Sequence, residues 1–331
     1  MAIHDVAARF YRDQLAGSWA PSYLGKRGFD PPVQQRWQIG YAPTNRDSLV
    51  SRLRAAGYPD SLIETSGLAR RTRNGALTDT FRDRVMLPIK DPYGRIVAFI
   101  GRAAESADPN VPKYLNSPTT PLYRKGDVLF GLWEARTTLQ SGAMPVITEG
   151  PFDAIAIAIA GHDRYAPVAL CGTILTARQV SVLATACDLR AVGVLVAFDA
   201  DNGGRRAAVR AYRLLSQVAG GTASVRFPAG SDPARIMADH GPGILAALLC
   251  HRRTPLADLV VDAQVAAWSQ RLRFAEGQIG ALRATAAEIA TMPARDVARQ
   301  VGRLADLLHL DHATVTEAVT DALTRLISPP R

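Results

Sequence analysis

The chain has 331 residues, of which 47% are hydrophobic, 21% are charged and three are cysteine. This length and composition predict two or three domains with substantial cores. No apolar run approaches the roughly 20 residues of a membrane helix, and no signal peptide is evident, so we expect a cytoplasmic protein without membrane contact. Because Cys171, Cys187 and Cys250 lie far apart with no Cys-x-x-Cys pair, we expect neither a zinc site nor a disulfide framework, and three buried thiols.

The formal net charge of +9 is spread unevenly along the chain. Residues 1–145 hold 20 Lys and Arg against 13 Asp and Glu, a net of +7, whereas the remainder holds 19 against 17, a net of +2. Such a division suits a protein in which one surface binds a polyanion while another binds metal ions. A basic face that only contacts solvent would give the same count. The positions of the charges are therefore needed to distinguish it from a surface that binds a polyanion.

The first part of the chain is expected to combine short helices with a small sheet. Helices are predicted over residues 4–15 and 47–56, the second ended by Gly57. Turns and strand-like runs follow in chain order: a hairpin turn at Asn74-Gly75, a strand at 85–89, a turn at Asp91-Pro92-Tyr93-Gly94 and a strand at 96–100.

Between about residues 143 and 250, apolar runs of strand length alternate with predicted helices. This order predicts an α/β domain with a mostly parallel central sheet. Residues 154–160 alternate like a strand but are alanine-rich like a buried helix, so periodicity alone leaves that segment open. The strand-like runs are 146–149, 166–171, 192–198 and 223–227, and the helices begin near Asp153, Thr176, Gly204 and Asp232.

Five acidic residues, Glu149, Asp153, Asp199, Asp201 and Asp232, come just after these strand-like runs. Ligands bind at the carboxyl edge of an open parallel sheet, so we expect the five carboxylates to meet there. If the strand continued through Asp199 and Asp201, both side chains would leave the same face and favour a hard cation between them. The alternatives are ordinary: a polar turn at Asp199 to Asp201, and helix caps at Asp153 and Asp232.

The order of these motifs resembles that of the TOPRIM domain, which is shared by bacterial primases, topoisomerases and some nucleases. Glu149-Gly150-x-x-Asp153 is followed about 50 residues later by Asp199-x-Asp201 and then by Asp232-Pro233. The resemblance implies that residues 154–160 form a helix. It also implies that the acids hold metal ions which carry phosphates.

A second resemblance covers the basic part of the chain. Phe81 to Ile89, Gly94 to Arg102, Pro112 to Pro118 and Tyr123 to Gly126 resemble, in this order, the amino-terminal half of the polymerase core of DnaG-type bacterial primases. Together the two resemblances run from about residue 8 to about 245. They imply that a set of basic residues lines a groove facing the metal site and holds template, primer or nucleotide phosphates: Arg82, Arg84, Arg102, Lys113 and Lys125.

From about residue 254 the chain becomes alanine-rich and helical. Val297, Val301, Leu304 and Leu308 fall at helical spacing, and Asp311 is a plausible cap for a last helix. A basic helical bundle could bind nucleic acid, although packing against the core is the simpler expectation. We therefore expect a basic amino-terminal lobe over 1–142, a TOPRIM catalytic domain over 143–252 and a helical subdomain over 253–331.

The resemblance implies a DNA-dependent RNA polymerase that makes short primers by two-metal nucleotidyl transfer. Its catalytic residues would be Glu149, Asp199 and Asp201. Glu149, Asp199, Asp201 and Asp232 would hold two Mg²⁺ or Mn²⁺ ions, and Asp153 would support this cluster from behind. The partners implied are a single-stranded DNA template, ribonucleoside triphosphates, and a replicative helicase or another protein that supplies template recognition.

Two departures from the family pattern leave other functions open. Where the family reads Asp-Pro-Asp, this chain reads Asp232-Pro233-Ala234, so one carboxylate is missing, and Asp239 could compensate only with a different backbone. The zinc-binding module that precedes the core in primases is not found in this sequence, so no zinc is expected here. The alternatives are a metal-dependent TOPRIM nuclease, and a non-catalytic accessory protein of a mobile element that binds single-stranded DNA.

Overall fold

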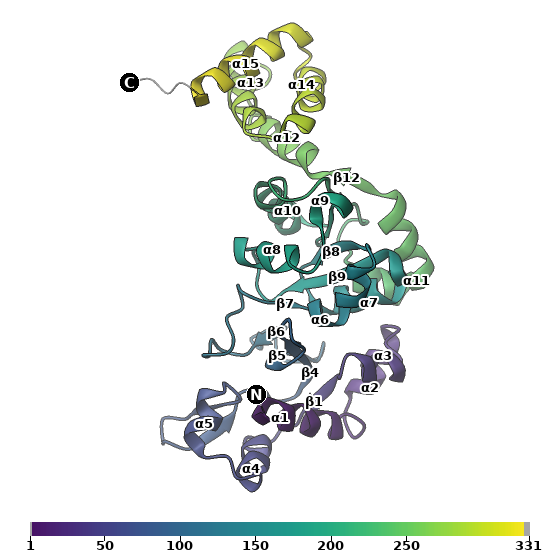
Figure 1. The fold of residues 1–331 in the computed structure, drawn as a ribbon, viewed down its shortest axis with the longest axis vertical. Helices are drawn as coiled ribbons and strands as arrows, with labels where there is room; N and C mark the ends of the chain where they lie inside the picture. Colours follow the sequence, from purple (N-terminus) through teal and green to yellow (C-terminus); the bar gives the residue numbers. More distant parts are fainter. Residues whose placement is uncertain (1, 328–331) are drawn as a thin grey trace.

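An antiparallel sheet of four strands forms the centre of the amino-terminal part of the molecule, at the bottom of Figure 1. The computed structural model describes residues 2–327. Within strand β4, side chains alternate between the two faces of the sheet. Val85 and Leu87 pack toward the centre of the molecule, whereas Met86 packs on the outer helices. The strands, in sheet order, are β1 (Gly40–Ala42), β4 (Arg84–Lys90), β5 (Ile96–Ala103) and β6 (Tyr114–Asn116).

Short helices and one hairpin surround this sheet. The hairpin turns at Asn74-Gly75, as predicted. The helix expected over 4–15 runs from Ala2 to Asp13 instead, and a looser turn follows it. The elements are α1 (Ala2–Asp13), α2 (Ala20–Lys26), α3 (Pro31–Arg36), α4 (Ser48–Ala55), α5 (Asp60–Thr65), β2 (Ala69–Arg71) and β3 (Leu77–Asp79).

A buried histidine in α1 makes the stability of this part depend on pH. His4 is 1% exposed, its Nε2 lies 3.2 Å from the Ser66 carbonyl oxygen, and burial lowers its pKa to about 4. The unfolded chain therefore takes up a proton near pH 6.5, before the folded chain does, so stability is lost as pH falls from about 6.5 to 4. We expect this loss to be about 3 kcal/mol.

The measurement is denaturant unfolding between pH 7 and pH 4, on the wild type and on His4→Leu. The variant should lose less stability over this range than the wild type, whatever its stability at pH 7. Equal losses in the two proteins would show that His4 does not carry the effect.

The middle of the molecule contains a six-stranded sheet in the order β12-β11-β10-β8-β9-β7. Its four central strands are parallel, and the short edge strands β7 and β12 are antiparallel to their neighbours. The predicted α/β class with a mostly parallel central sheet is confirmed. The strands are β7 (Leu129–Phe130), β8 (Met144–Thr148), β9 (Tyr165–Leu170), β10 (Val194–Ala197), β11 (Thr222–Val225) and β12 (Arg253–Pro255).

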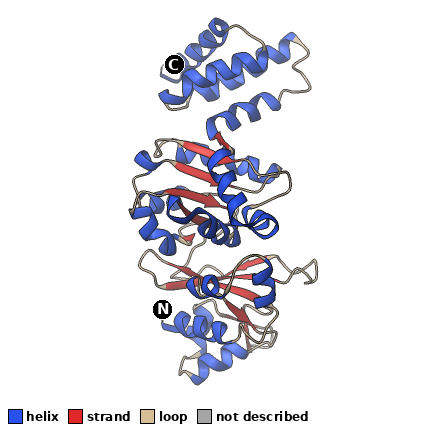
Figure 2. Ribbon diagram, turned by 90° about the vertical axis from the view of Figure 1, so that its right-hand side faces the viewer, coloured by secondary structure: helices blue, strands red, loops and turns tan. Residues whose placement is uncertain are grey.

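Helices cover both faces of this sheet (Figures 1 and 2). One face, which includes Val146 and Leu195, packs on α7 (Pro151–Gly161) and α11 (Pro233–His251). Residues 154–160 are thus helical, and Ala154 to Ile157 are fully buried, which explains why no amphipathic period marks them. The opposite face packs on α6 (Leu132–Gln140), α8 (Ala177–Ala184) and α10 (Asn202–Leu215), while η1 (His162–Arg164) and α9 (Leu189–Val192) are short connections.

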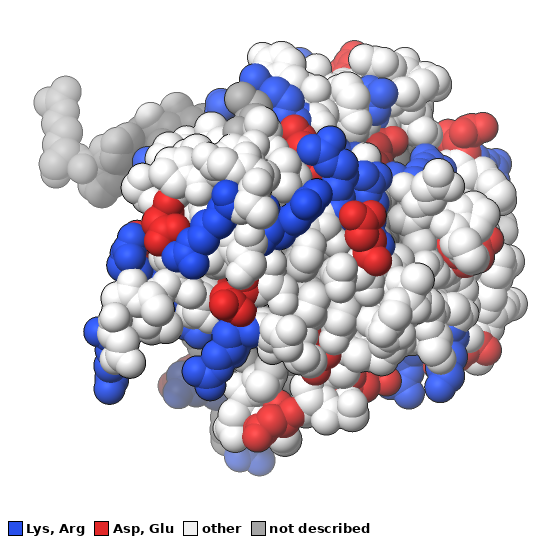
Figure 3. Space-filling model, turned by 90° about the horizontal axis from the view of Figure 1, so that it is seen from below, with Lys and Arg blue, Asp and Glu red and all other residues white. Residues whose placement is uncertain are grey.

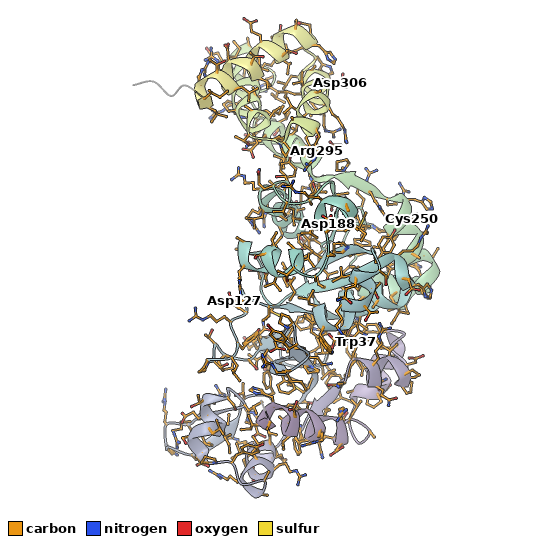
Figure 4. All side chains as sticks on the ribbon, viewed as in Figure 1. Trp37, Asp127, Asp188, Cys250, Arg295 and Asp306 are labelled. Carbon is orange, nitrogen blue, oxygen red and sulfur yellow. The ribbon has the colours of Figure 1, made fainter. Side chains whose placement is uncertain are left out.

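The two sheets share a continuous core. Side chains of β4 and β5 join those of α7 and β8 in one apolar cluster. Trp37, labelled in Figure 4, stacks on Phe130 of β7, and their ring centroids are 5.3 Å apart. The central sheet also extends beyond the limits of 143 and 252 that we expected, because it includes β7 on one side and β12 on the other. These strands of two and three residues are too short for periodicity to reveal.

The carboxyl-terminal part, at the top of Figure 1, is helical as far as the structure describes it. Val301, Leu304 and Leu308 are buried as their spacing predicts, and Asp311 accepts a hydrogen bond from Thr314 N at 2.8 Å. Arg295 joins this part to the middle by donating to the carbonyl oxygens of residues 216 and 219 (Figure 4). The helices are α12 (Leu256–Ala266), α13 (Ala275–Ala290), α14 (Ala294–Leu308) and α15 (His312–Ile327).

Two further expectations can be compared with these elements. Cys171 is buried, but Cys187 and Cys250 are only half-buried, because one follows α8 and the other lies in the last turn of α11, near the molecular surface. The expectation of three buried thiols was therefore wrong for two of them. Within residues 2–327, no helix combines the length and the apolar character that crossing a membrane requires.

Candidate active site

The central sheet changes its direction of winding beside β8. From β8 the chain crosses to β9 on one side, and it later reaches β10 on the other side, so the loops that follow β8 and β10 diverge and leave a crevice between them. Glu149 directly follows β8, and Asp199 lies two residues after β10. Asp199 N donates to Glu149 Oε1 at 3.4 Å, so these two acids meet at the crevice.

Two more acids reach this crevice from helix ends. Asp232 caps α11, with its Oδ1 accepting from Arg235 N at 2.6 Å. Asp153, in the first turn of α7, accepts from Gly150 N and from Ala234 N, each at 3.1 Å. Asp153 therefore connects the turn after β8 to the start of α11.

The carboxylates disturb one another electrostatically. The pKa of Glu149 is raised mainly by burial and secondly by the charge of Asp199. The pKa of Asp199 is raised mainly by burial and secondly by the charge of Asp232. Burial and the charges of Asp232 and Asp199 raise the pKa of Asp153 well above its ordinary value. The Lys113 ammonium opposes this effect at Asp199. Burial and mutual repulsion thus both disfavour the ionised form of these carboxylates.

A cavity of about 920 Å³ contains both these acids and a set of basic side chains. Four of the five predicted acids line it: Glu149, Asp153, Asp199 and Asp232. Three of the five predicted basic residues line it as well: Arg102, Lys113 and Lys125. Residues far apart in the sequence therefore form one site, in which carboxylates and cations share the same space.

Aromatic rings hold the basic side chains in place. Arg102 Nε donates to the Tyr23 hydroxyl oxygen at 3.1 Å, and its guanidinium lies 5.1 Å from the centre of the Tyr114 ring. Arg27, 4.8 Å above the Tyr23 ring, also lines the cavity and pairs with the Glu105 carboxylate. Arg27, Tyr23 and Glu105 were not among the predicted site residues. The basic pair Lys26-Arg27 could have indicated Arg27, whereas no sequence motif marks Tyr23 or Glu105.

Three predicted residues do not line the cavity: Asp201, Arg82 and Arg84. Asp201 caps α10, with its Oδ1 accepting from Gly204 N at 2.7 Å. Because β10 ends at Ala197, the condition for a shared strand face is not met, and Asp199 and Asp201 lie in the turn that follows the strand. Arg84 is buried, and its Nη1 donates to the carbonyl oxygens of Gly101 and of residue 112, next to Lys113.

Known protein families match both the amino-terminal part of the chain, which supplies the basic residues, and the part that supplies the acids. Residues 10–136 match the family model of the DNA primase catalytic core, N-terminal domain, and residues 146–237 match a Toprim-like model. A DNA primase of Mycolicibacterium smegmatis is 34% identical over 289 residues, which is 86% of this chain and 44% of that protein.

Solved structures agree over most of the chain. The RNA polymerase domain of Mycobacterium tuberculosis primase DnaG, in complex with a double-stranded DNA oligomer with a 6-nucleotide overhang, is 30% identical with a TM-score of 0.75. That match covers 93% of this chain and 96% of the mycobacterial one. A DnaG primase catalytic domain bound to single-stranded DNA is 27% identical with a TM-score of 0.77, covering 95% and 97%.

This chain belongs to the DnaG-type primase family. The resemblance inferred from the sequence is thereby confirmed. The chain spans less than half the length of the first curated primases that it matches, 44% and 41% for two of them. It corresponds instead to nearly the whole of the solved polymerase domains.

Ala234, which replaces the second acid of the Asp-Pro-Asp pattern, lines the cavity. The Ala234 side chain is 4% exposed, and its backbone N–H is used by Asp153. Asp239 also lines the cavity, although it is exposed and pairs with Arg235 at 3.4 Å. Among residues 2–327, no group of three or more His, Cys, Asp or Glu side chains is arranged closely enough to hold a metal ion as it stands.

Gly204 allows the start of α10 to approach the backbone of Asp199 closely, and this can be tested by substitution. A Cβ at residue 204 would lie 2.2 Å from the Asp199 carbonyl oxygen, so Gly204→Ala must displace the loop that carries Asp199. We expect a loss of about 1–3 kcal/mol of stability and, for the primer synthesis proposed below, a rate about 10²-fold lower because the carboxylate is misplaced. Gly221→Ala is the matched control, since nothing lies within 4 Å of its Cβ position. Equal activity of the two variants would refute this constraint.

Proposed function

We propose that this chain synthesises short RNA primers on single-stranded DNA by transferring nucleotides from ribonucleoside triphosphates. The observation that carries the proposal is the single cavity of about 920 Å³, in which carboxylates from the sheet edge face cations of the amino-terminal part. Figure 3 shows that Lys and Arg side chains also gather on the underside of that part, where a polyanion could approach. The primase relatives and the DNA-bound solved domains support the same function.

Toprim domains of primases are in general metal-dependent, and the donor set here fits a hard cation. Its donors are carboxylate oxygens, and the raised pKa values of Glu149 and Asp199 reflect burial first and the charge of a neighbouring carboxylate second, both of which a bound cation would offset. We propose Glu149, Asp199 and Asp232 as ligands of Mg²⁺ or Mn²⁺, with Asp201 reached by a shift of its loop. Once bound, such ions would stabilise the charge that develops on the α-phosphate and on the pyrophosphate leaving group.

The chain's own side chains would perform the remaining tasks. Arg102, Lys113 and Lys125 would bind nucleotide and template phosphates, the arginine as a fork and the lysines as point charges. Glu149, whose pKa is raised, is suited to accept the proton of the attacking hydroxyl if it is not needed as a ligand. On family grounds we also propose that a replicative helicase, or a partner that supplies template recognition, directs the protein to its template.

The test is the incorporation of labelled ribonucleotides on a single-stranded template with Mg²⁺ or Mn²⁺. A pre-annealed RNA primer is included so that extension does not depend on a partner for initiation. Template-dependent RNA is the expected result. Cleavage of the DNA without triphosphates would indicate the nuclease function instead. Salt-sensitive DNA binding without either reaction would indicate an accessory protein.

A further inference from the structure

The capping box at the start of α8 makes hydrogen bonds that the helix itself does not need. Thr176 Oγ1 accepts from Gln179 N at 3.0 Å, and Gln179 Oε1 accepts from Thr176 N at 3.1 Å, which is the usual reciprocal pair. In addition, Thr176 Oγ1 donates to Gly126 O at 2.6 Å. Gln179 Nε2 donates to Lys125 O at 3.2 Å and to Val128 O at 2.8 Å. Both side chains therefore bind the loop that carries Lys125.

The bonds to this loop are partly buried and closely packed. Gln179 is 1% exposed, so water does not compete for its amide. A Cβ on Gly126 would lie 3.4 Å from Thr176 Cγ2, which leaves little room between the loop and the helix. The loop, residues 117–128, joins β6 to β7 and has few strand partners of its own. Its first residue, Ser117, is hydrogen-bonded to Phe99, and Tyr123 is buried in the core, whereas residues 125–128 are held by these two side chains.

The same loop delivers Lys125 to the cavity. The Lys125 side chain is exposed, it lines the cavity, and its Cδ lies 3.9 Å from the Cβ position of Gly172, just past the end of β9. At the other end of the loop, Asn116 Nδ2 donates to Cys171 O at 2.9 Å. Both ends of the loop are thus attached to the carboxyl edge of the sheet that presents Glu149.

We propose that Gln179 and Thr176 are positioning residues for Lys125, holding its backbone so that the ammonium meets a phosphoryl group in the cavity. For the identity of that phosphoryl group, the inference rests on the proposed function. A lysine is a point charge on a flexible stem, so its backbone has to be fixed if the contact is to be strong. The phosphoryl group belongs either to a nucleoside triphosphate or to a nucleic-acid strand.

The test is a double-mutant cycle read by binding. Lys125→Met, Gln179→Leu and the double variant are titrated with inorganic triphosphate and, separately, with a single-stranded DNA oligonucleotide. We expect Lys125→Met to weaken one of these Kd values about tenfold, the effect of losing one charge-assisted hydrogen bond. Gln179→Leu should weaken the same Kd about fivefold, and the double variant should be no weaker than Lys125→Met. A change for triphosphate assigns the contact to the nucleotide, and a change for DNA assigns it to the strand.

Conservative variants separate positioning from folding. Thr176→Ser keeps the hydroxyl that donates to Gly126, whereas Thr176→Val removes it, so only the valine variant should share the weaker Kd. The proposal is overturned if the effects of Gln179→Leu and Lys125→Met multiply, or if Gln179→Leu lowers stability while both Kd values stay unchanged. Because these are binding measurements, they decide the role of Gln179 even if the wild type makes no primers, which would refute only the proposed function.

Discussion

Asp199→Asn should reduce primer synthesis on the order of 10³-fold and at the same time make the protein more stable. Asp199 has the central position at the crevice, with Glu149 on one side and Lys113 opposing its charge. The amide keeps the size of the side chain but removes the negative charge on which the proposed cation binding depends. The rate is measured by primer extension at saturating metal, and stability by denaturant unfolding.

The gain in stability follows from the sign of the pKa shift. Burial and the charge of Asp232 raise the pKa of Asp199 in the folded chain, so the ionised carboxylate costs stability. Below the unfolded pKa of about 3.9, the carboxyl group is protonated in both states and does not reduce stability. As pH rises through the folded pKa, the free energy of unfolding falls because the folded chain must ionise the group at a cost. Asp199→Asn should therefore be stabilising at pH 8, and this advantage should disappear near pH 4.

A matched control is Asp306→Asn, which makes the same chemical change on the exposed side of α14 (Figure 4). It should leave both activity and stability close to those of the wild type. If Asp199→Asn retained full activity, Asp199 would not belong to the catalytic machinery. If it lost activity together with stability, the loss would be one of folding.

The sequence allowed the acids to be located because their positions follow from local rules. Glu149 and Asp199 come just after apolar runs, and parallel strands bring such positions to one sheet edge. Asp153 and Asp232 precede or begin helices, where carboxylates accept backbone N–H groups, and the structure uses them in that way. These features depend on a few neighbouring residues, which a sequence displays directly.

The remaining features of the site depend on where strands end and on contacts across the fold. Periodicity could not show that β10 stops at Ala197, or that Asp201 caps α10 and does not line the cavity. Nor could it show that Arg27 stacks on Tyr23, or that the Gln179 amide binds a loop about 50 residues away in sequence. Thr176-x-x-Gln179 fits a helix capping box by itself, so nothing in the sequence indicates a second role for Gln179.

Breaking the ion pair between Lys90 and Glu134 should destabilise the protein by about 3–5 kcal/mol. Lys90 Nζ lies 2.7 Å from Glu134 Oε1, and the two side chains are only 8% and 9% exposed. Lys90 is on β4 of the amino-terminal sheet and Glu134 is on α6 of the central domain, so the pair lies where the two parts meet. Lys90→Met would leave the Glu134 carboxylate buried without its partner.

The double variant Lys90→Met/Glu134→Leu distinguishes the strength of the pair from the cost of an unpaired charge. Because two apolar groups of similar volume replace both charges, we expect it to recover most of the stability lost in Lys90→Met. Arg54→Met, which breaks the exposed pair with Asp60, is the control and should change the unfolding free energy very little. A double variant as unstable as Lys90→Met would mean that the pair is needed for the packing of the two parts, and that its charges do more than neutralise each other.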